Sequence, residues 1–254
     1  MLYDSHAHLD DPQFDADRKE IIQKIKDAGV DYLNNIGADM QTSAASVKLA
    51  EENEFIYATV GVHPSETTNM TESDIDELRR MAAHPKVVAI GEIGLDYHYE
   101  DTDKELQKKW FRRQLQLAKE LEMPVVIHDR ESGGDCIAIL KEMEITNGVM
   151  HCYSGSAETA KELLNMGFHI SFTGVLTFKN AKKAVQSVSV IPMERLMIET
   201  DCPYMAPEPY RGTRNDSSYV GKVAEKMAEI KGLSVAEVEC ITCENAKRFF
   251  GIAD

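Results

Sequence analysis

Short apolar runs rich in β-branched residues alternate along the chain with longer amphipathic segments. The runs have the length and composition of buried parallel strands, and eight are distinguished: Leu2–Ser5, Val30–Ile36, Ile56–Val62, Val87–Glu92, Val125–His128, Val149–His151, Phe168–Thr173 and Leu196–Glu199. Apolar residues at helical spacing oppose charged faces in the segments between them, including Asp15–Ala28, Thr71–Ala83, Leu106–Leu121 and Ala157–Met166. This alternation predicts an α/β protein with a closed (β/α)8, or TIM, barrel.

The length of the chain agrees with this fold, since 254 residues is close to the roughly 250 that are typical of such a barrel. An open doubly wound sheet would show a glycine-rich phosphate loop after its first strand, whereas the first strand here ends in histidines. No linker, low-complexity tract or short repeat interrupts the sequence. We therefore expect one catalytic barrel domain over residues 1–254, with the C-terminal helices included.

The charge balance limits the classes of partner. Acidic residues outnumber basic residues by 43 to 28, which gives a net charge of −15. This excess opposes non-specific attraction to nucleic acid or to an anionic membrane, so a polyanionic substrate must meet a local basic patch. The sequence shows neither a signal segment nor an apolar run long enough to cross a bilayer. We expect a cytoplasmic protein with no membrane association and no obligate protein partner.

Residue types that bind metals stand at the ends of separate predicted strands. The first strand ends in Asp4-Ser5-His6-Ala7-His8, and alternate strand residues share a face, so His6 and His8 can reach one ion. Other strand ends supply Glu92, His128, His151 and Asp201. The carboxyl ends of barrel strands form the face on which active sites lie. This pattern predicts a catalytic site for zinc, manganese or magnesium.

The motifs around these residues resemble those of the TatD family. They are Asp4-Ser5-His6-Ala7-His8, Gly91-Glu92-Ile93-Gly94-Leu95-Asp96-Tyr97, Pro124-Val125-Val126-Ile127-His128-Asp129-Arg130 and Glu199-Thr200-Asp201-Cys202-Pro203. The likeness continues through Gly61-Val62-His63-Pro64, His151-Cys152-Tyr153-Ser154-Gly155, Arg211-Gly212-Thr213-Arg214-Asn215 and Glu244-Asn245-Ala246-Lys247-Arg248-Phe249-Phe250-Gly251, and so covers essentially the whole chain. The resemblance implies a metal-dependent deoxyribonuclease with an amidohydrolase-type barrel.

The resemblance also implies how the ligands divide between two divalent ions, magnesium, manganese or zinc. His6, His8 and Asp201 are expected around one ion, and His128 and His151 around the other, with Glu92 bridging both. A bridging carboxylate can span two ions that lie about 3.5–4 Å apart, the separation used in two-metal phosphodiester hydrolysis.

Further roles follow from the chemistry that such a site needs. Asp201 can hold a metal and also accept the proton of the attacking water as a general base. His63 can hydrogen-bond a phosphate oxygen or the leaving group, and its alternative is a packing role in the loop. Arg130 and Arg211 can bind substrate phosphate or form ordinary salt bridges.

The favoured function is hydrolysis of DNA phosphodiester bonds, with single-stranded or end-bound DNA as the partner, because the acidic charge disfavours long duplexes. A second hypothesis is a metal-dependent ester or amide hydrolase, such as a D-aminoacyl-tRNA deacylase, because an activated water attacks acyl carbon as readily as phosphorus. A third is a non-catalytic nucleic-acid-binding or scaffold protein with structural ions.

Overall fold

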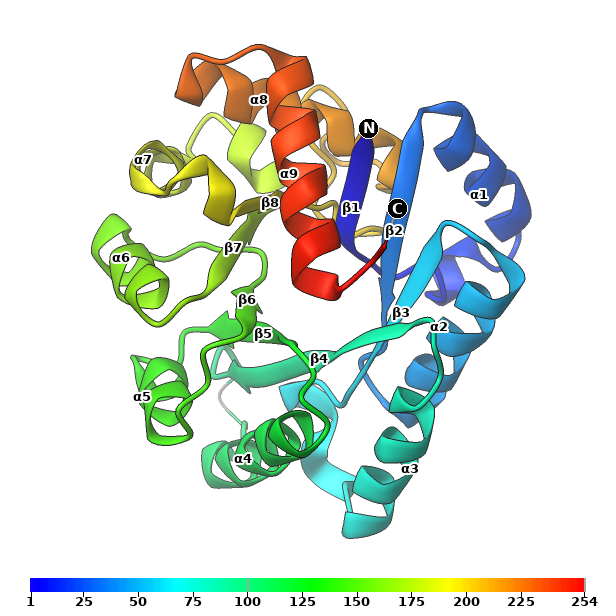
Figure 1. The fold of residues 1–254 in the computed structure, drawn as a ribbon, viewed down its shortest axis with the longest axis vertical. Helices are drawn as coiled ribbons and strands as arrows, with labels where there is room; N and C mark the ends of the chain where they lie inside the picture. The colour runs from blue at the N-terminus through cyan, green and yellow to red at the C-terminus, as the bar shows by residue number, and fades with distance from the viewer. Residues whose placement is uncertain (100, 254) are drawn as a thin grey trace. The chain divides into compact units, whose positions relative to one another are not determined.

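The computed structural model describes residues 1–99 and 101–253. Within these residues, eight strands form one sheet whose order follows the chain from β1 to β8 (Figure 1). Neighbouring strands pair in parallel. A further parallel bridge, between Ala7 and Cys202, joins the end of β1 to the segment after β8. The predicted (β/α)8 barrel is thereby confirmed.

The strands are short and most of the helices are longer. The strands are β1 (Leu2–Ala7), β2 (Val30–Ile36), β3 (Ile56–Val60), β4 (Val87–Asp96), β5 (Val125–Arg130), β6 (Gly148–Met150), β7 (His169–Phe172) and β8 (Leu196–Ile198). The α-helices are α1 (Arg18–Asp27), α2 (Met40–Glu52), α3 (Glu72–Ala82), α4 (Lys104–Glu120), α5 (Asp135–Glu142), α6 (Ala157–Asn165), α7 (Lys182–Val190), α8 (Val220–Lys231) and α9 (Val235–Phe250). Of the helices in the described part of the chain, none is both long and apolar enough to cross a membrane.

Strand β4 is longer than the predicted Val87–Glu92. Beyond Glu92 it continues to pair with β5, from Ile93 opposite Ile127 to Asp96 opposite Arg130. The apolar run marked only Val87–Glu92, because the last four residues of the strand include Gly94 and Asp96, which belong to the site described below.

Contacts divide the chain into two compact units. Unit 1 comprises Met1–Asn35, Cys152–Asn165 and the residues from His169 on, and unit 2 comprises Ile36–His151 with Met166–Phe168. The single domain predicted over residues 1–254, which includes the two positions outside the described residues, stays a prediction.

In unit 1, helix α9 packs against β1 and β8 (Figure 1). The buried ring of Tyr3 in β1 has its centroid 5.5 Å from the ring of Tyr32 and 6.0 Å from that of Phe250 in α9. Burying an aromatic side chain contributes about 1.5–3 kcal/mol, and ring pairs in this range add to that. These contacts hold in place the strand that carries His6.

In unit 2, helix α4 fixes the backbone of two segments through a pair of buried glutamines. Gln114 accepts the N–H of Val62 at 2.8 Å and donates to its carbonyl at 3.0 Å. Gln107 does the same with Asp96, at 2.9 and 3.0 Å. The two glutamines are two helical turns apart and therefore share one face of α4. This helix thus positions Asp96 and the residue before His63.

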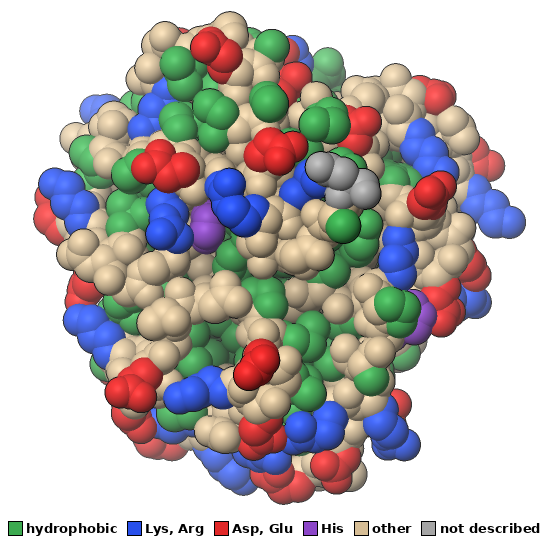
Figure 2. All heavy atoms as spheres, viewed as in Figure 1, with side chains coloured by type: hydrophobic (Ala, Val, Ile, Leu, Met, Phe, Trp, Pro, Cys, Tyr) green, Lys and Arg blue, Asp and Glu red, His purple; other side chains and the backbone are tan. Residues whose placement is uncertain are grey.

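Acidic and basic side chains lie interspersed on the face of the molecule shown in Figure 2. Along helix α8, Lys222 pairs with Glu225 at 2.7 Å and Lys226 with Glu229 at 2.8 Å. Cations paired in this way are largely neutralised and attract a polyanion weakly.

Candidate metal centre

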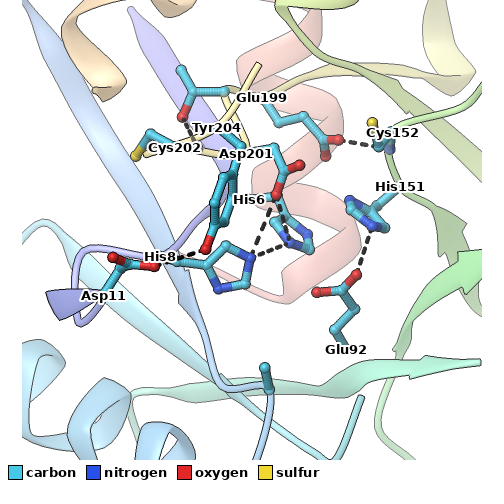
Figure 3. A network of polar contacts seen from close by, with 12 residues as sticks. His6, His8, Asp11, Glu92, His151, Cys152, Glu199, Asp201, Cys202 and Tyr204 are labelled. Carbon is cyan, nitrogen blue, oxygen red and sulfur yellow. Dashed lines mark hydrogen bonds and ion pairs between the residues drawn. The ribbon is translucent and has the colours of Figure 1, made fainter. Parts of the chain in front are cut away.

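Three predicted ligands converge in unit 1 (Figure 3). The Nε2 atoms of His6 and His8 lie 3.2 Å apart, and Asp201 Oδ1 lies 3.7 Å from the first and 3.4 Å from the second. The side chain of His6 is fully buried, whereas those of His8 and Asp201 each keep 13% of their exposure. The cluster is therefore held in the interior but remains accessible to small molecules.

Backbone hydrogen bonds between β1 and the segment after β8 set the geometry of this cluster. The Asp201 N–H donates to the carbonyl of His6 at 2.9 Å, and the His8 N–H donates to the carbonyl of Cys202 at 2.8 Å. Asp201 itself has a φ of 55°, in the left-handed region, which costs a residue with a side chain about 1–3 kcal/mol. The two flanking hydrogen bonds hold Asp201 in this conformation.

A buried carboxylate reinforces the same junction. Asp4 Oδ1 accepts the Thr200 N–H at 2.9 Å and Oδ2 accepts the Thr200 hydroxyl at 2.5 Å. Oδ1 also accepts the His6 N–H at 3.3 Å. Burial raises the pKa of Asp4 to about 7, although hydrogen bonds from Ser217 and Thr200 oppose the rise. Asp4 thus ties the strand that carries His6 to the residue that precedes Asp201.

Three further predicted ligands converge in unit 2, from β4, β5 and the end of β6. Glu92 Oε1 lies 2.8 Å from His128 Nδ1 and 2.7 Å from His151 Nε2. The two ring nitrogens are 3.3 Å apart. Figure 3 shows the His151 ring directed at the Glu92 carboxylate. The carboxylate is therefore the centre of this cluster.

Asp96 fixes the orientation of His128. Its Oδ2 lies 3.3 Å from His128 Nε2, so the ring presents Nδ1 to Glu92. Burial acts to raise the pKa of Asp96, but the hydrogen bond from His128 and the backbone N–H of His98 outweigh it and lower the pKa to about 2. A carboxylate behind a histidine in this way commonly orients a metal ligand.

A glycine lets the two strands approach at this point. Gly94 has a φ of 151°, and a Cβ atom there would lie 1.9 Å from the carbonyl oxygen of His128. Any side chain would push β5 away from β4. Gly94 therefore allows Glu92 and Asp96, on the same face of β4, to reach the two nitrogens of one ring.

His63 lies beside this second cluster. Its Nε2 is 3.7 Å from Glu92 Oε1, and its ring meets that of His128 edge to face at 4.4 Å. Its Nδ1 accepts the N–H of Ser65 at 3.2 Å, so a neutral ring carries its proton on Nε2. Burial lowers the pKa of His63 to about 3.

The donor atoms of both clusters fit divalent ions. Two ligand atoms about 2.0–2.2 Å from one ion, at tetrahedral or octahedral angles, are about 2.8–3.6 Å apart. The separations here run from 2.7 to 3.7 Å. Imidazole combined with carboxylate is a donor set for zinc or manganese, and the carboxylates also admit magnesium. These residues could therefore hold metal.

The structure does not bring the two predicted substrate-binding arginines into either cluster. Arg130 is exposed at the end of β5, with its guanidinium 5.9 Å from the ring centroid of Tyr99. Arg211 is exposed in the segment between β8 and α8, 4.3 Å from the ring centroid of Phe178. Among the described residues, neither guanidinium lies within ion-pair distance of a carboxylate. Their role in substrate binding stays a prediction.

Sequence reasoning assigned no role to several polar residues around the clusters. Asp96 could have been found, because it alternates with Glu92 and Gly94 on one strand. Glu199 is buried and accepts the Cys152 N–H at 2.7 Å and the Ser171 hydroxyl at 2.6 Å, and it belongs to the same motif as Asp201. Asp4 lies two residues before His6 and shares its face of β1.

Comparisons with known proteins agree with this geometry. The family described as TatD related DNase matches residues 3–251. The uncharacterized metal-dependent hydrolase YabD of Bacillus subtilis (strain 168) is 48% identical over 254 residues, covering 99% of this chain and 100% of that protein. The 3′-5′ ssDNA/RNA exonuclease TatD of Rahnella sp. (strain Y9602) is 30% identical over 260 residues, covering 99% of each.

A solved structure extends the comparison to the fold. The crystal structure of YJJV, a TatD homologue from Escherichia coli K12, superposes with a TM-score of 0.94 at 28% identity, covering 99% of this chain and 98% of that one. A match of this extent includes the strands that carry both clusters. The chain therefore belongs to the TatD-related DNase family and is a metal-dependent hydrolase.

Proposed function

We propose that this hydrolase is a nuclease that cleaves the phosphodiester bonds of DNA from single-stranded ends. The observation that carries the proposal is the pair of imidazole–carboxylate clusters, each with donor atoms spaced for a divalent ion. We assign one ion, magnesium, manganese or zinc, to each cluster. The relative named as an exonuclease for single-stranded DNA and RNA supports the choice of substrate class.

The residues of the clusters divide the work of hydrolysis. Divalent ions bound here would lower the pKa of water and neutralise charge that develops on a phosphodiester. Asp201 directs Oδ1 toward His6 and His8, and its Oδ2 accepts the proton of the attacking water. Asp201 therefore serves both as a ligand and as the general base.

His63 supplies a hydrogen-bond donor. Because its Nδ1 accepts the Ser65 N–H, the proton of the neutral ring is on Nε2. That proton can be donated to a phosphate oxygen or to the leaving oxygen. The neutral state of His63 suits this task. A protonated His63 ring would be attracted to the Glu92 carboxylate, 3.7 Å from its Nε2, and would compete there with divalent cations.

Arg130 and Arg211 are the cations that we assign to substrate phosphate. Each lies against an aromatic ring, at 5.9 and 4.3 Å, and such stacking leaves the edge of the guanidinium free to donate. Arg214 is different, because Asp17 accepts from both of its terminal nitrogens, at 3.0 and 2.5 Å. Two cations suit the short or terminal DNA segment that the net charge of −15 favours.

Product analysis on defined substrates tests the proposal. Labelled single-stranded DNA, duplex DNA, RNA and a D-aminoacyl-tRNA would each be incubated with the protein and magnesium, manganese or zinc. We expect stepwise shortening of single-stranded DNA that is abolished by chelation, greatly slowed by Asp201→Asn and unchanged by His84→Ala. Turnover of the aminoacyl ester without cleavage of DNA would assign the deacylase function instead. Turnover of no substrate would favour a non-catalytic protein.

A further inference from the structure

Tyr204 is a large aromatic residue that is exposed and yet rigidly held. It lies three positions after Asp201, and half of its surface, 50%, is accessible to solvent. Met205, the next residue, is also exposed and has a φ of 57°, which turns the chain away after the tyrosine. An exposed aromatic ring has no role in the core, so its surroundings must explain why it is held in place.

The hydrogen bonds of Tyr204 anchor both its backbone and the tip of its ring. Its N–H donates to the carbonyl of Asp201 at 2.9 Å, and its carbonyl accepts from Asn215 Nδ2 at 2.6 Å. Its hydroxyl donates to Asp11 Oδ2 at 2.8 Å, a contact visible in Figure 3. The other oxygen of Asp11 accepts the N–H of Gln13 at 2.8 Å, so the acceptor is itself held.

Two of these anchors connect Tyr204 to the cluster of unit 1, because Asp201 belongs to that cluster and Asn215 bonds to the residue before Asp201. Asn215 is buried and donates to the carbonyl of Thr200 at 2.9 Å as well as to that of Tyr204. Thr200 is also the residue that donates two hydrogen bonds to the Asp4 carboxylate. The exposed ring is therefore fixed to the same backbone that positions Asp201. A group bound against the ring would be placed relative to that carboxylate.

The chemistry of this segment fits an unpaired nucleobase. Single-stranded nucleic acids are held by aromatic rings on which bases stack, combined with cations for the backbone. Tyr204 offers the ring, and Arg211 in the same segment offers the cation. A rigid tyrosine gives a large contact area at a low entropy cost. In a duplex both faces of an internal base are occupied by its neighbours, so a base in an unpaired end is the one that can swing onto the ring.

We infer that Tyr204 stacks on the base of the nucleotide next to the scissile phosphate and so makes the enzyme selective for single-stranded ends. This inference rests on the proposed nuclease function. It assigns Tyr204 to substrate selection and leaves ligation and proton transfer to the cluster residues.

The test uses single-stranded oligonucleotides that carry either a normal nucleotide or an abasic residue at the 3′ or the 5′ terminus. We expect kcat/KM of the parent to fall by about 5- to 150-fold on the abasic substrate at the end that is degraded. Tyr204→Leu should lose a similar factor on the normal substrate and nothing further on the abasic one. Tyr204→Phe keeps the ring and should still discriminate between the two.

Tyr210→Leu is the matched control. Tyr210 is 36% exposed in the same segment, but its ring already stacks on Tyr219 with centroids 4.2 Å apart. Its substitution should leave the ratio of the two substrates unchanged. Metal content by elemental analysis should be the same in the parent and in all three variants.

The outcomes separate this inference from the proposed function. Equal losses on normal and abasic DNA in Tyr204→Leu would mean that Tyr204 acts only by holding Asp201. Equal rates of the parent on the two substrates would overturn the inference without any variant, even if the variants do not fold. If the parent cleaves no DNA with any ion, the proposed function fails and the inference falls with it.

Discussion

The two clusters of candidate metal ligands contain the same kinds of side chain but are built by different means. In unit 1, His6 and His8 come from one strand, and backbone hydrogen bonds from β1 position Asp201. In unit 2, Glu92, His128 and His151 come from three strands, and side chains orient them. The first cluster is fixed by strand geometry, and the second by the packing of α4, Gly94 and Asp96.

This difference predicts where each cluster is vulnerable. A change in a supporting side chain should affect unit 2 most, because the Asp96 side chain orients His128 and the Gln107 side chain bonds both backbone groups of Asp96. In unit 1, both the Asp4 side chain and two backbone hydrogen bonds hold the segment that carries Asp201 in place. The substitutions below test this contrast, beginning with the ligands themselves.

Removing a ligand from each cluster should have the largest effect. His8→Ala should lower the bound metal by one ion and nearly abolish hydrolysis, because it takes one of the three donors from unit 1. Glu92→Ala should lower the occupancy of both ions, because the resemblance to the TatD family implies that Glu92 bridges them. Elemental analysis and turnover would be measured on the same samples, with His84→Ala as the control.

His84 suits this purpose because its partner is Glu51, 3.2 Å from its Nε2, and it belongs to no cluster. Loss of a single ion in Glu92→Ala would confine Glu92 to its own cluster. Full metal content in His8→Ala would remove that histidine from the ligand set.

Asp201→Asn should come next in size. Asparagine keeps the volume and one metal-binding oxygen but cannot accept the proton of water. The rate should fall by roughly 10²–10⁴-fold, the range for loss of a general base. Single-turnover cleavage of short single-stranded DNA at saturating ion would measure it, with metal content determined in parallel. A cleavage rate close to that of the parent, with the metal sites fully occupied, would show that Asp201 is not the general base.

Asp96→Asn should have a moderate effect confined to unit 2. The asparagine side chain can still contact His128 Nε2, but it lacks the negative charge that holds the His128 ring with Nδ1 toward Glu92. Losses of about 10- to 100-fold in metal affinity or activity are typical when such a partner is replaced. Titration with manganese would show weakening of one site only. Equal weakening of both sites would contradict the contrast between the clusters.

The sequence was most informative where local periodicity determines geometry. His6 and His8 are two residues apart on a strand, so their convergence followed from the pattern alone. Glu92, His128 and His151 are separated by 36 and 23 positions, and no local period relates them. Only their common place at strand ends, together with the family motifs, indicated that they meet.

The supporting contacts could not be predicted in the same way. Gln107 and Gln114 bind backbone groups of other segments, and Tyr204 is anchored by Asp11 and Asn215, which are distant in sequence. A glutamine on a helix or a tyrosine in a loop has many possible partners. Packing selects among them, so such contacts become visible only in the folded chain.

The smallest expected effect concerns a histidine of unit 1 that belongs to neither cluster. His169 begins β7 and packs on Phe249 of α9, with ring centroids 5.1 Å apart. Burial, with Arg195 and Arg248 nearby, lowers its pKa from 6.5 to about 4. The unfolded chain therefore binds the proton more readily than the folded one. The stability that His169 contributes is complete above pH 6.5 and is lost as the pH falls toward 4.

His169→Gln should flatten this dependence without changing turnover at neutral pH. Between pH 7.5 and pH 5 the parent should lose about 2 kcal/mol of unfolding free energy that the variant keeps. Urea titrations of both proteins at the two pH values measure the difference, because the remaining titratable groups are common to both proteins and cancel. Parallel losses in the two proteins would show that His169 has the same pKa in the folded and the unfolded chain.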